Sequence, residues 1–316
     1  MAFELLLFIV GFAILITSAR ILVSGAVSIA RILKISSWVI GIVIVGLGTS
    51  IPELAVSISS SFAGNNIGIG AIIGGNTFNL LVILGLVAAF SPIFIRREWY
   101  KDIFINIGAV FASSLVVLLP ILGDQDFVGI TRLEGVLLSV IFVIWFVFML
   151  KRKAIEGDEG DYQVFATFAS VVMLFVGMIG VFVGGQWVVS GAEAIAHFLS
   201  VSPVIIGLTV VGVGTSLPEL TVSLVALMKR QKGIAVGNII GSNIFGFLGI
   251  LGITGLIKPI AVIEHIALDI IIAVIVAVVV AVLALFTGER GVLSRREGIL
   301  LVLSYFVYLF LIMMNI

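Results

Sequence analysis

The sequence predicts an all-α membrane protein with ten transmembrane helices, arranged as two inverted five-helix repeats with the N-terminus and C-terminus outside. Three observations support this fold class: an apolar composition, apolar runs that recur from end to end, and a long motif that occurs twice. The chain of 316 residues is 61% hydrophobic and 11% charged, with a mean hydropathy of +1.36. Soluble domains are typically about 45–50% apolar, so the excess is expected to face lipid.

Apolar runs long enough to cross a membrane occur throughout the chain. A helix needs roughly 20 apolar residues to span a hydrocarbon layer of about 30 Å. The first run is one of many, which indicates a membrane span rather than a removable leader. The expected spans are residues 5–30, 38–62, 67–90, 103–122, 133–150, 165–199, 203–228, 234–257, 266–286 and 298–313.

The distribution of basic residues predicts the orientation. Loops on the cytoplasmic side of a membrane protein carry an excess of Lys and Arg. With the N-terminus outside, the inner loops contain Arg31, Lys34, Arg96, Arg97, Lys101, Lys151, Arg152, Lys153, Lys229, Arg230, Lys232, Arg290, Arg295 and Arg296. The outer loops contain only Arg132 and Lys258, and Arg20 lies within the first span. This bias predicts that both termini are outside.

The span count predicts two halves of opposite orientation. Five spans precede the charged segment KRKAIEGDEGDYQ and five follow it, so the second half enters the membrane from the other side. We expect residues 1–150 to form the first five-helix repeat, 151–163 a cytoplasmic linker and 164–316 the second repeat. The most similar parts of the two halves are 37–90 and 203–257. Inverted repeats are typical of transporters that bind their substrate near the bilayer midplane.

The strongest likeness between the halves includes one acidic residue in each. Residues 41–57 read GIVIVGLGTSIPELAVS and residues 207–223 read GLTVVGVGTSLPELTVS, with Glu53 and Glu219 in matching places. An ionisable side chain at the centre of a membrane helix costs roughly 2.5 to 3.5 kcal/mol on insertion scales. The repetition of such a costly residue indicates a cation site to which both halves contribute.

The residues around each acid favour oxygen coordination. Pro52 and Pro218 have no N–H, so the carbonyls of Gly48 and Gly214 lose their helical partners. Unwound backbone at membrane depth is tolerated only where it faces protein or a wet cavity. Hydroxyl oxygens are added by Thr49, Ser50, Thr215 and Ser216. Calcium takes about 6 to 8 oxygen ligands, and two carboxylates neutralise one such ion.

A second pair of matching segments supplies amides. These segments are GAIIGGNTFNLLVILGL at 70–86 and GNIIGSNIFGFLGILGI at 237–253. Asn76 and Asn79 are three residues apart and share one helical face, and Asn243 is the counterpart of Asn76. Two roles remain open for Asn76 and Asn243: their amide oxygens bind the cation, or their amides tie the broken helices together.

The paired G-x-G-T-S-[IL]-P-E-L motifs, each followed by G-x-I-I-G-[GS]-N-x-F, resemble the two α-repeats of the cation/calcium exchanger superfamily, and most of all its prokaryotic sodium/calcium antiporters. The resemblance covers both halves and implies the same order of ten helices. It implies that Glu53 and Glu219 are the central acidic ligands. The other implied site residues are Thr49 and Thr215 through carbonyl and hydroxyl oxygens, Ser50 and Ser216 as lining residues, Gly46 and Gly212 through carbonyls, Asn79 through its amide, and Ser242 through its hydroxyl.

Two positions depart from the family pattern. Gly246 stands where family members with a defined site often have Asp or Asn, and Gly75 stands where a serine serves a sodium site. Neither change touches the two glutamates. The sequence therefore predicts a calcium position but leaves the coupling ion and its stoichiometry open.

The expected function is antiport of cytoplasmic calcium against external sodium by alternating access, in the cell membrane of a prokaryote. The resemblance implies that the first and sixth spans move across a fixed core. Calcium and sodium are transported ions, and no cofactor, nucleic acid or obligate protein partner is expected besides the lipid bilayer.

Three alternatives accompany this interpretation. A pair of buried glutamates with raised pKa values would exchange calcium for protons, which makes a proton/calcium antiporter the nearest alternative. An intramembrane hydrolase that used Ser50 or Ser216 would need a nearby base such as His or Lys, and the motifs contain neither. A passive cation channel is the third alternative, although inverted repeats with broken helices favour alternating access.

Overall fold

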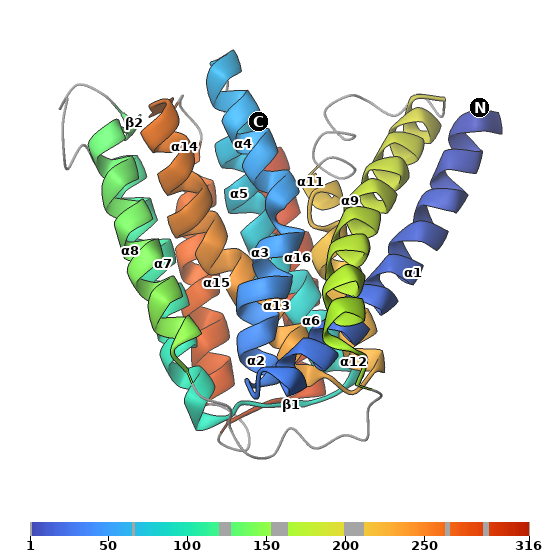
Figure 1. The fold of residues 1–316 in the computed structure, drawn as a ribbon. Coiled ribbons are helices and arrows are strands. Elements are labelled where there is room, and N and C mark those ends of the chain that lie inside the picture. The colour runs from blue at the N-terminus through green and yellow to red at the C-terminus, as the bar shows by residue number, and fades with distance from the viewer. Residues whose placement is uncertain are drawn as a thin grey trace. The chain divides into compact units, whose positions relative to one another are not determined.

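The computed structural model describes residues 2–64, 67–119, 128–152, 164–198, 212–262, 266–286 and 291–315, and most of these residues are helical. The helices are α1 (Ala2–Ile32), α2 (Ser37–Ile40), α3 (Leu47–Thr49), α4 (Ile51–Ala63), α5 (Ile67–Phe78), α6 (Leu84–Phe90), α7 (Tyr100–Leu118), α8 (Arg132–Leu150), α9 (Thr167–Phe198), α11 (Gly212–Gly214), α12 (Leu217–Met228), α13 (Lys232–Ile244), α14 (Leu251–Ile257), α15 (Ile266–Phe286) and α16 (Arg295–Asn315). Figure 1 shows these helices along the chain.

Helical turns of other kinds continue several of these helices. Turns with π geometry cover Gly41–Gly46, Asn79–Ile83 and Phe245–Ile250, and a 3₁₀ turn covers Arg97–Trp99. The π turns at Asn79–Ile83 and Phe245–Ile250 fall in matching segments of the two repeats. The apolar sequence of these segments predicts a helix but carries no sign of the wider turn.

The described helices agree with a protein that spans the membrane many times. Seven of them are long and apolar enough to cross a membrane, and the total is eight if the bent pair Ser37–Thr49 and Ile51–Ala63 is one span. The expected spans 67–90 and 266–286 coincide with described helical stretches. Residues 199–211, which include the expected start of the seventh span, and most of the expected linker lie outside the described residues.

The chain forms two compact units, and each unit combines segments from both halves of the sequence. Unit 1 consists of Met1–Pro52 and Lys151–Asn238, and unit 2 of Glu53–Leu150 and Ile239–Ile316. Of the three boundaries, one falls within α4 in the acidic motif of the first repeat, one falls within α13 in the amide segment of the second, and one follows α8 at Leu150. The two compact units therefore do not coincide with the two expected five-helix repeats.

Unit 1 is built on the long pair α1 and α9, which run side by side (Figure 1). Glycines of α9 recur at 177, 184 and 191 and face α1. An added Cβ at Gly177 would lie 2.7 Å from the backbone of Leu22, and one at Gly184 would lie 2.6 Å from the nitrogen of Leu15. Small residues at such spacing allow membrane helices to approach closely, so these glycines account for the tight α1–α9 contact.

The turn after α12 also holds α1. The ammonium group of Lys229 donates to the carbonyl oxygen of Arg20 at 3.1 Å and to the hydroxyl of Ser24. Burial, followed by the positive charge of Arg20, lowers the pKa of Lys229. Lys229 thus connects α12 to α1 within unit 1.

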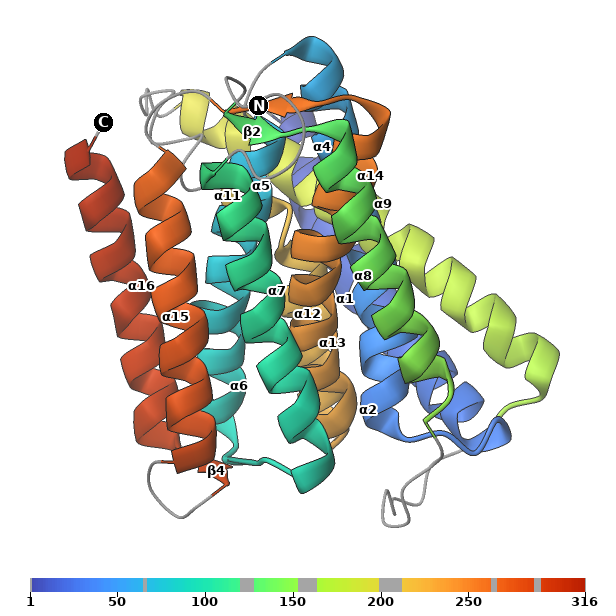
Figure 2. The same cartoon turned by 90° about the vertical axis from the view of Figure 1, so that its left-hand side faces the viewer.

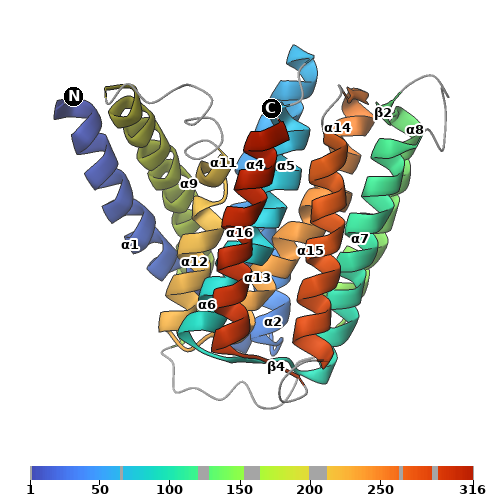
Figure 3. The same cartoon turned by 180° about the vertical axis from the view of Figure 1, so that it is seen from behind.

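Unit 2 contains a row of long helices in which α15 lies between α16 and α7 (Figure 2). On another side of this unit, α14 packs against α8 (Figure 3), and α16 packs against α6. Two short antiparallel ladders connect loop segments: β1 (Ile93–Phe94) pairs with β4 (Val292–Leu293), and β2 (Gly129–Ile130) pairs with β3 (Ile260–Ala261). Two residues are too few to show a strand pattern, which explains why an all-α sequence prediction misses these ladders.

The α1–α9 contact leads to a stability prediction. We expect Gly177→Ala to lower the melting temperature in detergent, because forcing an extra methyl into a packed contact typically costs about 1–3 kcal/mol. The matched control is Gly108→Ala in α7, where an added Cβ meets nothing within 4 Å. The control should leave the melting temperature unchanged or raise it slightly, because alanine favours helix over glycine. Equal melting temperatures for both variants would contradict the proposed role of Gly177.

Candidate functional site

Both acidic motifs interrupt their helices immediately before the proline. In the first motif, α3 ends at Thr49, Ser50 has φ −92° and ψ 9°, and α4 begins at Ile51 with a bend of 42°. In the second, Ser216 has φ −92° and ψ 4° between α11 and α12. The predicted break at each motif is confirmed. Pro52 and Pro218 occupy the first turn of the following helix, where a missing N–H does no harm.

Each acid therefore lies in the first turn of a new helix. Glu53 is in the first turn of α4 and Glu219 in the first turn of α12. Their exposed fractions are 9% and 0%. The unsatisfied N–H groups at a helix start carry partial positive charge and stabilise a carboxylate there, so the break places both carboxylates in favourable local positions.

Within unit 1, the structure brings together residues from both motifs. The hydroxyl of Ser50 donates to Oε1 of Glu219 at 3.0 Å, and both side chains are buried. The serine of the first motif thus supports the acid of the second. This contact links residues far apart in the sequence, and the motif spacing alone could not predict it.

Thr49 is also tied to the second repeat, through Asn238. Its hydroxyl oxygen lies 3.1 Å from Oδ1 of Asn238 and 3.3 Å from the carbonyl oxygen of Gly46. Asn238 is completely buried in α13. Sequence comparison of the repeats overlooked Asn238 because its counterpart is Ala71. The sequence signal that indicates Asn238 is the presence of an amide side chain within an otherwise apolar segment.

Within unit 2, the three predicted asparagines are connected by the side-chain amides of Asn79 and Asn243 and the backbone carbonyl of Asn76. Nδ2 of Asn79 donates to Oδ1 of Asn243 at 3.2 Å, and Nδ2 of Asn243 lies 3.5 Å from the carbonyl oxygen of Asn76. Oδ1 of Asn79 is buried and has no hydrogen-bond partner among the described residues. The Asn243 contact therefore orients the Asn79 amide so that its oxygen is left as an acceptor.

Gly246 is closely covered by the side chain of Asn76. An added Cβ at Gly246 would lie 2.6 Å from Nδ2, 3.2 Å from Oδ1 and 3.3 Å from Cγ of Asn76. A larger residue at 246 would need Asn76 to move. At this position, where the sequence departs from the family pattern, the side-chain amide of Asn76 fills the space beside Gly246.

The remaining predicted residues are placed as follows. Ser216 and Ser242 are buried, Gly212 is the first residue of α11, and Oγ1 of Thr215 is buried without a hydrogen-bond partner among the described residues. Residues 207–211, the start of the second motif, lie outside the described part of the chain. No group of three or more His, Cys, Asp or Glu that could hold a metal occurs among the residues described. Hydroxyl, amide and backbone oxygens would therefore have to supplement any carboxylate ligand.

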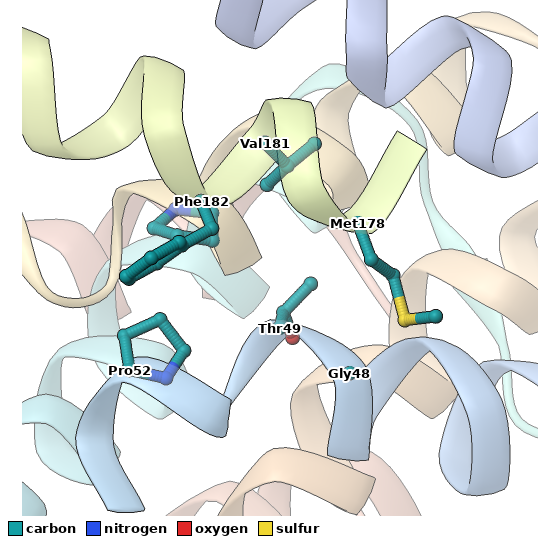
Figure 4. A pocket seen from close by; sticks show the side chains of 7 residues that line it. Gly48, Thr49, Pro52, Met178, Val181 and Phe182 are labelled. Carbon is teal, nitrogen blue, oxygen red and sulfur yellow. The ribbon is translucent and has the colours of Figure 1, made fainter. Parts of the chain in front are cut away.

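A small crevice adjoins the first motif in unit 1 (Figure 4). Its lining residues are Gly48, Thr49, Pro52, Met178, Val181, Phe182 and Pro218. Met178 from α9 sits directly against Gly48, so that an added Cβ there would collide with its sulfur. Glycine at 48 thus lets an apolar side chain of α9 lie over the broken helix beside Thr49.

Comparison with known proteins identifies the family of this chain. The family model described as sodium/calcium exchanger protein matches residues 3–151 and 169–314. The sodium/calcium exchanger MaX1 of Methanosarcina acetivorans is 30% identical over 343 residues, which cover 96% of this chain and 97% of MaX1. The inner membrane protein YrbG of Escherichia coli K12 is 32% identical over 265 residues, covering 80% of this chain and 79% of YrbG.

A solved structure of the sodium-calcium exchanger NCX_Mj, soaked with sodium and calcium, has a TM-score of 0.82 to this chain at 30% identity, covering 96% of this chain and 97% of the other. The match extends over both repeats, and it excludes the intramembrane hydrolase as an interpretation of Ser50 and Ser216. The chain therefore belongs to the sodium/calcium exchanger family and is a membrane transporter, not an enzyme.

Proposed function

We propose that this protein exchanges cytoplasmic calcium for external sodium by alternating access at a site near the membrane midplane. Family membership supports the choice of ions, since MaX1 and NCX_Mj are both named as sodium/calcium exchangers. The observation that carries the proposal is the paired motif in which a buried glutamate opens a new helix after a break. Each break exposes backbone and hydroxyl oxygens beside a carboxylate, which is the donor set that calcium prefers.

The proposed ligand set follows the motifs. Glu53 and Glu219 supply the carboxylates, and occupancy by calcium or by sodium excludes the other ion. Asn79 supplies an amide oxygen, in keeping with the orientation of its amide by Asn243. The bonds that join Asn243 to Asn79 and to the backbone carbonyl of Asn76 favour a structural role for the Asn243 amide. The buried amide nitrogen of Asn76 has no hydrogen-bond partner among the described residues, and its amide oxygen stays a proposed ligand. The further proposed ligands are oxygens of Thr49, Thr215, Ser50, Ser216, Gly46, Gly212 and Ser242.

The proposed architecture comprises ten spans in two inverted repeats, at 1–150 and 164–316, with both termini outside the cell. A prokaryotic cell membrane is the proposed location, in keeping with the name of the inner membrane protein YrbG. The close glycine-mediated packing of α1 and α9 supports the proposal that these two helices move as a pair during alternating access.

A second candidate is proton/calcium exchange. Gly75 and Gly246 offer no side-chain oxygen, and the Asn76 amide packs against Gly246. With fewer oxygens for sodium, the glutamates would exchange calcium for protons. This candidate keeps the same carboxylates and differs only in the coupling ion.

The coupling ion is tested with purified protein in liposomes. We expect uptake of radioactive calcium when an outward sodium gradient is imposed, because sodium leaving the vesicle drives calcium in. An outward proton gradient without sodium should give no uptake above that of empty vesicles. Calcium uptake driven by the proton gradient alone would show that protons, and not sodium, are the coupling ion. Calcium uptake in the absence of both the sodium and the proton gradient would instead indicate a channel.

The two carboxylates are tested by Glu53→Gln and Glu219→Gln. Each variant keeps the shape of the side chain but removes its charge, so we expect each to abolish sodium-driven calcium uptake while the protein still purifies as a folded monodisperse species. The matched control is Glu98→Gln, the same change at an exposed acid, which should transport normally. Normal uptake by either motif variant would disprove the two-carboxylate site.

The roles of the amides are separated by comparing Asn79→Leu with Asn243→Leu. Loss of a ligand at 79 should raise the KM for calcium more than loss of the group that orients it. For Asn243→Leu we expect a rise of about two- to tenfold, the size of one net hydrogen bond. Thr77→Val serves as the control, because the Thr77 hydroxyl donates to the carbonyl of Ile73 in its own helix. A larger effect at Asn243 than at Asn79 would reverse the two roles.

A further inference from the structure

We propose that Asn238 is a positioning residue that fixes the direction of the Thr49 hydroxyl, so that its oxygen faces the transported cation as an acceptor. This inference rests on the proposed function of the same site. It adds a residue that the motif comparison of the two repeats does not reveal, because position 71 in the first repeat is alanine.

The orientation of the Asn238 amide is fixed by the chemistry of its partners. Nδ2 lies 3.2 Å from the carbonyl oxygen of Glu219 and 2.9 Å from Oγ of Ser223. A backbone carbonyl only accepts hydrogen bonds, so the amide nitrogen must face it. The Ser223 hydroxyl donates to the carbonyl of Ala235 at 3.2 Å and therefore accepts from Asn238. Both N–H groups of the amide are thus used.

This leaves the amide oxygen of Asn238 facing Thr49. An amide oxygen only accepts, and the oxygen of the Thr49 hydroxyl lies 3.1 Å away. The single hydroxyl hydrogen of Thr49 must therefore point at Asn238. The carbonyl oxygen of Gly46 lies 3.3 Å from the same hydroxyl oxygen, and the lone pairs of the Thr49 oxygen remain available.

The spacing of these two oxygens suits joint coordination of one cation. Two oxygens bound to calcium at about 2.4 Å, at a right angle to each other, lie about 3.4 Å apart. The separation of 3.3 Å between the Thr49 hydroxyl oxygen and the Gly46 carbonyl oxygen is close to that value. If the hydroxyl hydrogen pointed at Gly46 instead, it would stand between the two oxygens and repel the ion. Asn238 prevents that arrangement.

The two repeats differ in sequence at the position of this amide. Thr215 is the counterpart of Thr49, and its buried hydroxyl oxygen has no hydrogen-bond partner among the described residues. The counterpart of Asn238 is Ala71, which carries no amide.

A purely structural role for Asn238 makes a different prediction. As a buried amide of α13 that contacts α3 and α12, it contributes to stability in either case. A structural role would lower the melting temperature of a variant without changing its affinity for ions. The test must therefore measure ion affinity separately from stability.

The experiment is a double-mutant cycle with Asn238→Leu and Thr49→Val. The rise in melting temperature with added calcium or sodium gives an apparent Kd in detergent, and the KM for calcium is measured in liposomes. We expect each single variant to raise the apparent Kd about three- to tenfold, the size of one net hydrogen bond. The double variant should be no weaker than the weaker single variant, because both changes remove the same preset oxygen.

The matched control is Ser28→Ala, which removes a buried hydroxyl that bonds Ser170 in the α1–α9 contact. It should lower the melting temperature but leave the apparent Kd unchanged. Asn238→Ala repeats the comparison if Asn238→Leu does not fold. An unchanged Kd in the Asn238 variant, or effects of the two single changes that multiply in the double variant, would overturn the inference.

Separate titrations with sodium, calcium, potassium and manganese distinguish this inference from the proposed function. If neither sodium nor calcium stabilises the wild-type protein, the proposed function is wrong. The cycle is then run with the cation that does stabilise it. A dependence of that cation's Kd on the Asn238–Thr49 pair would still support the inference, and its absence would reject it.

Discussion

The burial of a carboxylate inside an apolar membrane protein is the constraint on which the rest of this structure depends. Glu219 is completely buried, and taking a charged group out of water is costly unless charges or hydrogen bonds compensate it. The start of α12 and the hydroxyl of Ser50 supply partial positive charge to this carboxylate. In the proposed function a bound cation would add to this compensation, and the burial of the acid would then contribute to ion affinity.

The irregular backbone follows from that constraint. A continuous helix would direct the N–H groups around Glu53 and Glu219 into its own hydrogen bonds, and no helix start would face either carboxylate. The breaks at Ser50 and Ser216 create such starts, and the prolines then fit without loss. The π turns at Asn79–Ile83 and Phe245–Ile250 widen the neighbouring helices, a geometry that is frequent at functional sites.

Much of the fold could be predicted from the sequence because its signals are local. The apolar runs at 67–90 and 266–286 match described helical stretches, and the break at each motif follows from Pro52 and Pro218. The bond between Ser50 and Glu219 could not be predicted, because it depends on how distant segments pack. Asn238 was missed for another reason. A comparison that searches for residues shared by the two repeats does not detect a residue that only one repeat contains.

The two repeats are alike in sequence but unequal in chemistry, and the differences offset one another. Gly75 is matched by Ser242, and Gly246 is matched by Asn79, so each matched pair keeps one oxygen-bearing side chain. At Gly246 the Asn76 amide occupies the space beside the backbone, so a larger residue there would require Asn76 to move. The threonines differ in the same manner, since Thr49 is held by Asn238 and the matching position for that amide is Ala71. The proposed ligands are therefore not equivalent in the two repeats, although the acidic motifs that carry them are nearly alike in sequence.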